Sequence, residues 1–370
     1  MNALPKIDMA EVTRLTREGR LKDAMALLLG KALTSAPPMK GESAPPATPS
    51  LHLPETLRGV LNKFGGALPG GNGLPVARRG AAFVPPPGAR FEARTHQSAA
   101  GRLGYKLYVP SSQSSGHPVP LVVMLHGCSQ SPDDFAAGTR MNELAEEQDF
   151  LVVYPGQTEA ANMSRCWNWF KAGDQRRDHG EPAMIAGVTR EIVAEFAVDP
   201  ARVYVAGLSA GGAAAAIMAA EYPDLYAAVG VHSGLAHGCA SDMASAFAAM
   251  NSGGSAPAKG ARRFVPTIVF HGDEDRTVHP ANADHVIAQS RSAETFDSAV
   301  TSGQAPGGVA FTRMVESNPQ GQAVLEQWVL HGAGHAWSGG SPAGSFTDPR
   351  GPDASREMLR FFNQHVGTHS

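Results

Sequence analysis

The stretch Arg202-Val-Tyr-Val-Ala-Gly-Leu-Ser209-Ala-Gly-Gly212 decides the fold of this chain. A run rich in β-branched residues leads into Gly-x-Ser-x-Gly, and small residues with helical spacing follow at 213–221. This order predicts a strand, a sharp turn and a helix, with the hydroxyl of Ser209 exposed on the turn. Such a turn crowds backbone against backbone, which explains glycine at 207 and 211. An ordinary glycine-rich loop has the same pattern, so a nucleophilic serine also needs an acid, a histidine and oxyanion donors elsewhere.

The composition excludes several classes of function. The chain has 370 residues, of which 42% are apolar, and a formal net charge of -3 without a basic stripe. We therefore expect no nucleic-acid partner, and the longest apolar run, at 213–220, is too short to span a membrane. There is no Gly-x-Gly-x-x-Gly after a first strand, no Walker loop and no His-Glu-x-x-His, so we expect no cofactor and no metal. The three cysteines match no zinc spacing, and they permit one disulfide without requiring it.

Three segments follow from the periodicity. Residues 1–34 have the pattern of a helical hairpin, which either docks on the rest of the protein or binds a separate partner. Because this segment lacks the features of a signal peptide, we expect a cytoplasmic location. Residues 35–90 contain 11 of the 28 prolines, a composition typical of a poorly ordered linker. Residues 91–370 form the catalytic domain.

The catalytic domain has an α/β pattern. Apolar runs that predict strands alternate with longer helical patterns, which implies a mostly parallel sheet with helices on both faces. The predicted strands are 104–110, 121–125, 150–154, 202–208, 226–232, 266–271 and 324–330. The predicted helices are 133–148, 182–197, 213–221 and 354–364.

We expect the acid and the histidine just after strands, because the functional groups of such sheets lie at the carboxyl ends of the strands. Asp275 follows the strand 266–271 and is the candidate acid, with Asp273 as the reserve. His335 follows the strand 324–330, and the glycines before it allow a tight loop to turn its ring toward Ser209. His331, on or just after the strand, is better explained as a core residue whose polar atoms are satisfied.

The oxyanion donors are expected beside the serine. His126-Gly127-Cys128 follows the strand 121–125, and the backbone N–H groups of Cys128 and Ala210 would form a hole with two donors. The ring of His126 either takes part in the site or only pins this loop, since the oxyanion hole needs the backbone and not the imidazole. Trp167 and Trp169 alternate with Asn168, so both rings share a face and could line an acyl cleft or pack in the core. The same two interpretations apply to Trp337.

Taken together, these motifs resemble the poly(3-hydroxybutyrate) depolymerase family of esterases in the α/β-hydrolase superfamily. The resemblance rests on LHGCSQ at 125–130, CWNWF at 166–170, VAGLSAGG at 205–212, the Asp275 loop, GHAW at 334–337 and TDP at 347–349. It implies an α/β-hydrolase fold and a serine esterase that cleaves short-chain hydroxyalkanoate polyesters or their oligomers. It also favours a disulfide between Cys128 and Cys166, which a reducing cytosol would oppose.

Other functions remain open at this stage. The same family extends to esterases of feruloylated or acetylated plant polysaccharides, and its secreted members imply an extracellular location as the alternative. A function of a different class is a non-catalytic scaffold on polymer granules, with the N-terminal hairpin as the binding element. The sequence does not specify an oligomeric state.

Overall fold

The computed structural model describes residues 83–115, 117–254, 265–291 and 296–367. The hairpin predicted for residues 1–34 and most of the linker predicted for residues 35–90 lie outside these ranges. The strands are β1 (Arg90–Ser98), β2 (Gly101–Val109), β3 (Val119–Leu125), β4 (Leu151–Gly156), β5 (Val198–Leu208), β6 (Ala228–His232), β7 (Thr267–Gly272), β8 (Asp297–Gln304), β9 (Ala310–Ser317), β10 (Ala323–Leu330), β11 (Trp337–Ser338) and β12 (Thr347–Asp348). The helices are η1 (Ser111–Ser115), α4 (Pro132–Thr139), α5 (Met141–Gln148), η2 (Ala172–Gln175), α6 (Gly180–Glu195), α7 (Ala210–Glu221), α8 (Met243–Ser252), α9 (Ala281–Gln289) and α10 (Ala354–Phe362).

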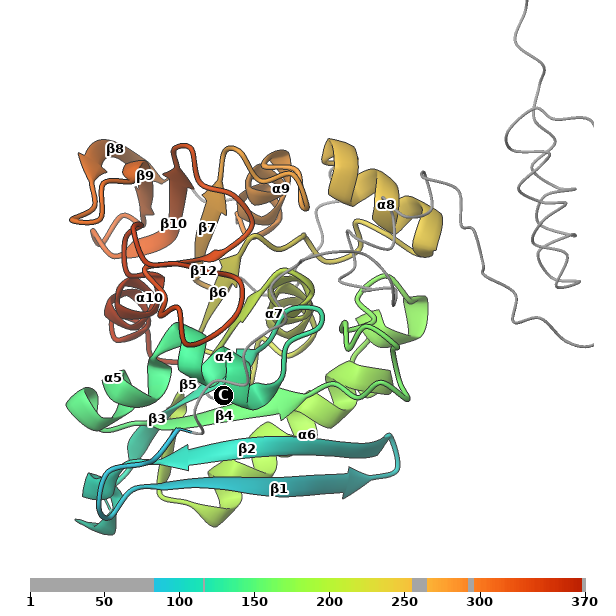
Figure 1. The fold of residues 1–370 in the computed structure, drawn as a ribbon, viewed down its shortest axis with the longest axis vertical. Helices are drawn as coiled ribbons and strands as arrows, with labels where there is room; N and C mark the ends of the chain where they lie inside the picture. The colour runs from blue at the N-terminus through green and yellow to red at the C-terminus, as the bar shows by residue number, and fades with distance from the viewer. Residues whose placement is uncertain (1–82, 116, 255–264, 292–295, 368–370) are drawn as a thin grey trace, which may run out of the picture. The chain divides into compact units, whose positions relative to one another are not determined.

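One ten-stranded sheet organises the described residues, with the order β1-β2-β4-β3-β5-β6-β7-β10-β9-β8 (Figure 1). The strands from β4 to β10 in this order are all parallel. The pairs β1–β2 and β2–β4 at one end, and β10–β9 and β9–β8 at the other, are antiparallel. The prediction of a mostly parallel α/β sheet is confirmed.

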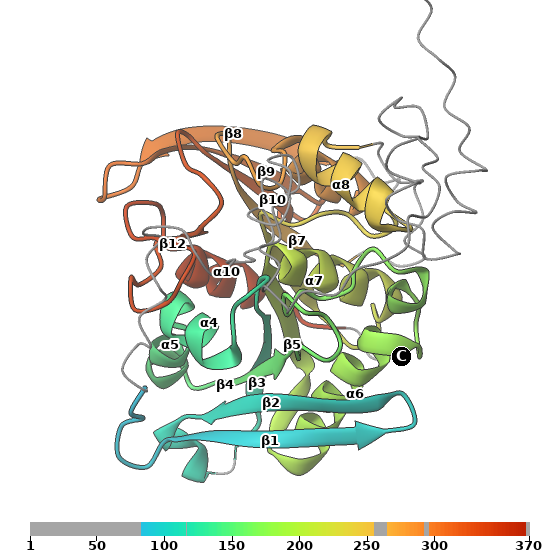
Figure 2. The same cartoon turned by 45° about the vertical axis from the view of Figure 1, so that its right-hand side comes forward.

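Helices cover both faces of this sheet (Figure 2). Strand β5 shows why: Val203 and Val205 pack into the core shared with α6, α7 and α9, while Tyr204 and Ala206 pack into the core shared with α4, α5 and α10. Alternating side chains of a strand point to opposite faces, so a strand that is apolar at every position needs a layer on each side. Within the described ranges, no helix is long and apolar enough to cross a membrane.

The helix predicted at 133–148 is in fact two helices. Helix α4 begins after Ser131, whose side chain accepts a hydrogen bond from the N–H of Asp134 at 3.2 Å, and it ends at Arg140, which has φ 55°. Helix α5 begins directly after this left-handed residue. A residue with positive φ interrupts a right-handed helix without an added loop. Arg140 is not a residue type that favours this conformation, so the sequence does not predict the break.

Candidate active site

Ser209 lies on the turn between β5 and α7, where the Gly-x-Ser-x-Gly motif predicts it, but it is only 9% exposed and not the exposed residue that was expected. Its backbone has φ 58° and ψ -119°, a strained conformation of the kind that persists at functional sites because the surroundings enforce it. A Cβ on Gly207 would lie 2.7 Å from the carbonyl oxygen of Leu125, and a Cβ on Gly211 would lie 2.5 Å from that of His126. Both glycines are therefore required by the close approach of the preceding strand and loop.

Asp275 and His335 are in direct contact. Asp275 follows β7 and His335 follows β10, and Asp275 Oδ2 lies 2.7 Å from His335 Nδ1. The carboxylate is fully buried and the imidazole is 11% exposed. Burial alone raises the pKa of Asp275, but the hydrogen bonds from His271 and His335 outweigh it and hold this pKa well below its usual range. The carboxylate is therefore ionised and can orient the imidazole.

The strands β5, β7 and β10 that carry Ser209, Asp275 and His335 are parallel. Their carboxyl ends lie at one edge of the sheet, and each of the three residues follows such an end. Asp273, the reserve acid, contacts a different histidine: Asp273 Oδ2 lies 2.8 Å from His331 Nδ1. This second pair is far more exposed, at 38% for the aspartate and 43% for the histidine, so the prediction that His331 is a core residue is wrong.

Two further histidines lie beside the pair and were missed in the sequence. His271 in β7 has its Nε2 2.9 Å from the carbonyl oxygen of Val278 and 3.4 Å from Asp275 Oδ2. His232, at the end of β6, accepts a hydrogen bond from the N–H of Ser338 at 3.0 Å. Burial lowers the pKa of His232 to about 3, so its ring is neutral. Each of these histidines lies at or near the end of an apolar strand, and this position was the signal in the sequence that could have identified them.

The loop after β3 lies against the nucleophile. A Cβ on Gly127 would lie only 3.6 Å from the Cβ of Ser209. The N–H of Gly127 donates to Gln130 Oε1 at 2.8 Å and is not available to a ligand, whereas the N–H of Cys128 has no partner among the described residues. Ala210 is the first residue of α7, where a backbone N–H has no intrahelical acceptor. The amides of Cys128 and Ala210 are therefore the free donors beside Ser209.

His126 holds this loop in place. Its Nδ1 lies 2.7 Å from the carbonyl oxygen of Gly127, and its Nε2 accepts the N–H of Gln157 at 3.0 Å. Burial lowers the pKa of His126 to about 4, which keeps the ring neutral and able to donate on one side and accept on the other. Of the two interpretations of His126, the pinning role fits these contacts.

A disulfide joins Cys128 to Cys166, with a Cα–Cα distance of 4.2 Å. It links the loop after β3 to the aromatic segment 166–170. Cys239 is a free thiol, and burial raises its pKa to about 12. A thiol with this pKa is not a nucleophile near neutral pH.

The tryptophans do not line an open cleft, contrary to the substrate-binding interpretation. Trp167 is 0% exposed and Trp337 is 1% exposed. The indole N–H of Trp167 donates to the carbonyl oxygen of His126 at 3.1 Å, and Trp337 stacks on His232 with ring centroids 5.1 Å apart. Trp169 packs edge-on against Phe170 and is 6% exposed. An alternation of apolar and polar residues is expected both for a strand in the core and for the wall of a cleft, so the sequence could not distinguish these two positions for the tryptophans.

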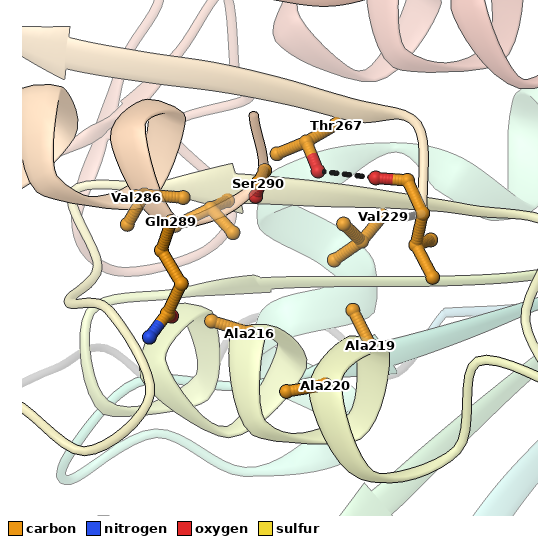
Figure 3. A pocket seen from close by; sticks show the side chains of 10 residues that line it. Ala216, Ala219, Ala220, Val229, Thr267, Val286, Gln289 and Ser290 are labelled. Atoms are coloured by element: carbon orange, nitrogen blue, oxygen red, sulfur yellow. Dashed lines mark hydrogen bonds between the residues drawn. The ribbon is translucent and has the colours of Figure 1, made fainter. Parts of the chain in front are cut away.

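A small cavity of about 30 Å³ lies between α7 and α9 (Figure 3). It is lined mainly by Ala216, Ala219, Val229 and Val286, together with Gln289 and Ser290. None of the candidate catalytic residues borders it, so it is not the ester site. Among the described residues, no group of three or more His, Cys, Asp or Glu side chains is arranged to hold a metal ion.

The chain is similar in sequence and fold to known esterases. Residues 103–310 match the family described as "Esterase PHB depolymerase". The chain is 34% identical to poly(3-hydroxyalkanoate) depolymerase C of Paucimonas lemoignei over 64% of this chain and 58% of the relative. It is also 34% identical to feruloyl esterase B of Neurospora crassa over 38% of this chain and 46% of the relative. The alignments thus span about half the length of these curated relatives.

A solved acetyl xylan esterase from Aspergillus awamori has a similar fold, with a TM-score of 0.54 and 19% identity over 75% of this chain and 99% of that structure. The sheet, the helices on both faces and the serine turn define an α/β-hydrolase. Because the family match covers more than half of its residues, the chain belongs to the PHB depolymerase family of esterases.

Proposed function

We propose that this protein is a serine-dependent carboxylic ester hydrolase that works through an acyl-enzyme. The observation that carries the proposal is the 2.7 Å contact between Asp275 and His335, at the sheet edge where β5 also ends in the strained turn of Ser209. The family match and the names of the relatives support the same chemistry.

The roles of the residues follow from their contacts. His335 takes the proton of Ser209 as its oxygen attacks the ester carbonyl carbon, and Asp275 holds the imidazole in the required tautomer. The amides of Cys128 and Ala210 donate to the oxyanion of the tetrahedral intermediate, where each donor contributes roughly 10²- to 10³-fold to kcat. His335 then returns its proton to the leaving alcohol. Water releases the acid by the same steps in reverse order.

We propose poly(3-hydroxybutyrate), other short-chain polyhydroxyalkanoates or their oligomers as substrates. The depolymerase aligns over more of the chain than the feruloyl esterase does, at equal identity, and this difference favours the hydroxyalkanoate. Feruloyl and acetylxylan esters are the alternative substrates of the same chemistry.

The experiment compares wild type with Ser209→Ala on p-nitrophenyl esters of short acids, 3-hydroxybutyrate oligomers, and feruloyl and acetyl sugar esters. Loss of about 10⁶-fold in kcat is expected if the three residues act as a unit, with the hydroxybutyrate oligomers cleaved fastest. Ser252→Ala, at the exposed end of α8, is the matched control. Equal rates for wild type and Ser209→Ala would remove Ser209 as the nucleophile.

A non-catalytic granule scaffold predicts a different result. Wild type would then cleave none of these esters but would sediment with polymer granules, and removal of residues 1–90 would abolish the sedimentation. Loss of sedimentation with retained ester hydrolysis would instead assign polymer binding to the N-terminal segment of an enzyme.

A further inference from the structure

The proposed mechanism does not use the buried carboxyl group of Glu181, which hydrogen bonds connect to the loop after β3. Glu181, in the first turn of α6, is 6% exposed. Among the described residues, no lysine, arginine or histidine forms an ion pair with it. A charge buried without a counter-ion costs several kcal/mol of desolvation, so its surroundings should show what it does.

The partners of Glu181 are all hydrogen-bond donors. Oε2 accepts the backbone N–H of Asn168 at 2.7 Å. Oε1 accepts the side-chain amides of Asn168 and Gln157, each at 2.5 Å. An ionised carboxylate only accepts hydrogen bonds, whereas a protonated one brings a hydrogen of its own. Three donors on two oxygens therefore favour the ionised form, because a hydrogen bond to a charged acceptor is roughly twice as strong as one to a neutral acceptor, and protonation weakens all three.

Gln157 connects this carboxylate to the oxyanion loop. Its side chain donates to Glu181 and to the carbonyl oxygen of Cys166, the disulfide partner of Cys128. Its backbone N–H donates to His126 Nε2 at 3.0 Å, and His126 Nδ1 lies 2.7 Å from the carbonyl oxygen of Gly127. Through Gln157, Glu181 is thus linked to the carbonyl group of Gly127, which precedes the Cys128 amide, and to Cys166, which is bonded to the Cys128 side chain.

Few charged groups surround Glu181. Asp174 in η2 accepts the N–H of Glu181 at 2.9 Å, and it is the one acidic neighbour in the small cavity beside the carboxyl group. The residues of α7 that face this cavity, Ala214, Ile217 and Met218, are uncharged. On the side of the loop, the nearest titratable group along the path is His126. Burial, together with the charge of Asp174, raises the pKa of Glu181 to about 7.

We propose that ionised Glu181 is a positioning residue that holds the loop of His126, Gly127 and Cys128 in the shape of the oxyanion hole, so that ester hydrolysis falls when Glu181 is protonated. This inference rests on the proposed function, because it assigns the Cys128 amide to the oxyanion. It adds an ionisation of Glu181 to the acid side of the pH profile.

The experiment measures kcat against pH, from about 5 to 9, with one soluble ester. For wild type, kcat should fall about tenfold more between pH 8 and pH 5 than it does in Glu181→Gln, because protonation of Glu181 adds its own loss of activity. Glu181→Gln, which resembles the protonated state, should lower kcat about tenfold near pH 8 and should match the wild-type rate near pH 5. Glu143→Gln, an exposed glutamate in the first turn of α5, is the matched control and should behave like wild type.

A second variant moves the ionisation instead of removing it. Asp174→Asn keeps an oxygen that accepts the Glu181 N–H and removes the neighbouring negative charge. It should lower the pKa of Glu181 and make the enzyme about two- to fivefold more active than wild type near pH 6, with equal rates near pH 8. A residue with only a structural role would not produce this shift.

The outcomes separate the two proposals. Full activity in Ser209→Ala would overturn the proposed function. An inactive Ser209→Ala together with a constant ratio of wild-type to Glu181→Gln rates from pH 8 to pH 5, or an unchanged profile in Asp174→Asn, would overturn the role of Glu181 alone.

Discussion

Asp275 is held by its own loop at the same time as it holds His335. Oδ2 lies 2.7 Å from His335 Nδ1, and Oδ1 accepts the backbone N–H groups of Thr277 and Val278 at 2.8 and 2.9 Å. The carboxylate therefore cannot rotate without breaking two backbone hydrogen bonds. Because Nδ1 of His335 donates to Asp275, its Nε2 is left without a proton and can accept one from Ser209.

We expect Asp275→Asn to lower kcat by about 10⁴-fold with little change in KM. The amide can present its N–H₂ group to His335 Nδ1, which selects the tautomer that cannot take the serine proton; an aspartate-to-asparagine change in a serine protease triad has an effect of this size. Steady-state kinetics on a p-nitrophenyl ester, with circular dichroism to verify folding, gives the answer.

Asp273→Asn is the matched control, because Asp273 also contacts a histidine, His331, at 2.8 Å. It should keep kcat within about tenfold of wild type, since that pair is exposed and belongs to a different histidine. If the two variants lost activity equally, the acid would have to be reassigned.

We expect Gly207→Ala to destabilise the protein by more than about 4 kcal/mol or to prevent folding. A Cβ at this position would overlap the backbone of Gly211 and Leu125, and neither can move without displacing α7 or β3. Gly173→Ala provides the comparison, because a Cβ there has no neighbour within 4 Å. Denaturant midpoints that agree within error for the two variants would contradict the steric role of Gly207.

The three candidate catalytic residues could be predicted because each has a local signal in the sequence. Ser209, Asp275 and His335 each follow an apolar run, and the topology of a parallel sheet brings such ends to one edge. The order of the runs and the glycines beside them required no knowledge of distant contacts. The disulfide between Cys128 and Cys166 came instead from the family resemblance, since spacing alone does not pair cysteines.

Other features have no such signal. Strand β8 is exposed along nearly its whole length, so its sequence carries no apolar period by which to find it. Trp167 and Trp337 are buried by neighbours distant in sequence, which a local pattern does not contain. Glu181 resembles any acidic residue in the first turn of a helix, and only the fold shows that Asn168 and Gln157 surround it.

We expect the double variant Cys128→Ala and Cys166→Ala to lose about 2 to 4 kcal/mol of unfolding free energy, because the disulfide closes a loop with a sequence separation of 38. Activity should fall as well, since Cys128 provides a proposed oxyanion donor. Dithiothreitol should reproduce both effects in wild type and have no effect on the double variant. Cys239→Ala should keep the response to dithiothreitol, and a wild type that is equally stable and active after reduction would refute the prediction.

The pH dependence of stability should reveal the buried ionisable groups. Burial lowers the pKa of His126 and His365 to about 4 and that of His232 to about 3, whereas the unfolded side chains titrate near 6.5. Between about pH 6 and 5 the unfolded chain therefore binds roughly three protons that the native protein does not.

Glu181 opposes this trend, because its pKa of about 7 in the native protein makes the native state bind one proton more. We expect the unfolding free energy to fall by about 2.7 kcal/mol as the pH decreases from 6 to 5, which corresponds to a net two protons.

In Glu181→Gln the opposing proton is lost, so the same step should cost about 4.1 kcal/mol. His179→Gln, at an exposed histidine, should leave the wild-type slope unchanged. Urea unfolding at a series of pH values measures these slopes. A wild-type unfolding free energy that rises by about 1.4 kcal/mol over this interval, the effect of Glu181 alone, would show that the three histidines are protonated in the native protein, and therefore that the ring of His126 does not hold the oxyanion loop in the neutral form.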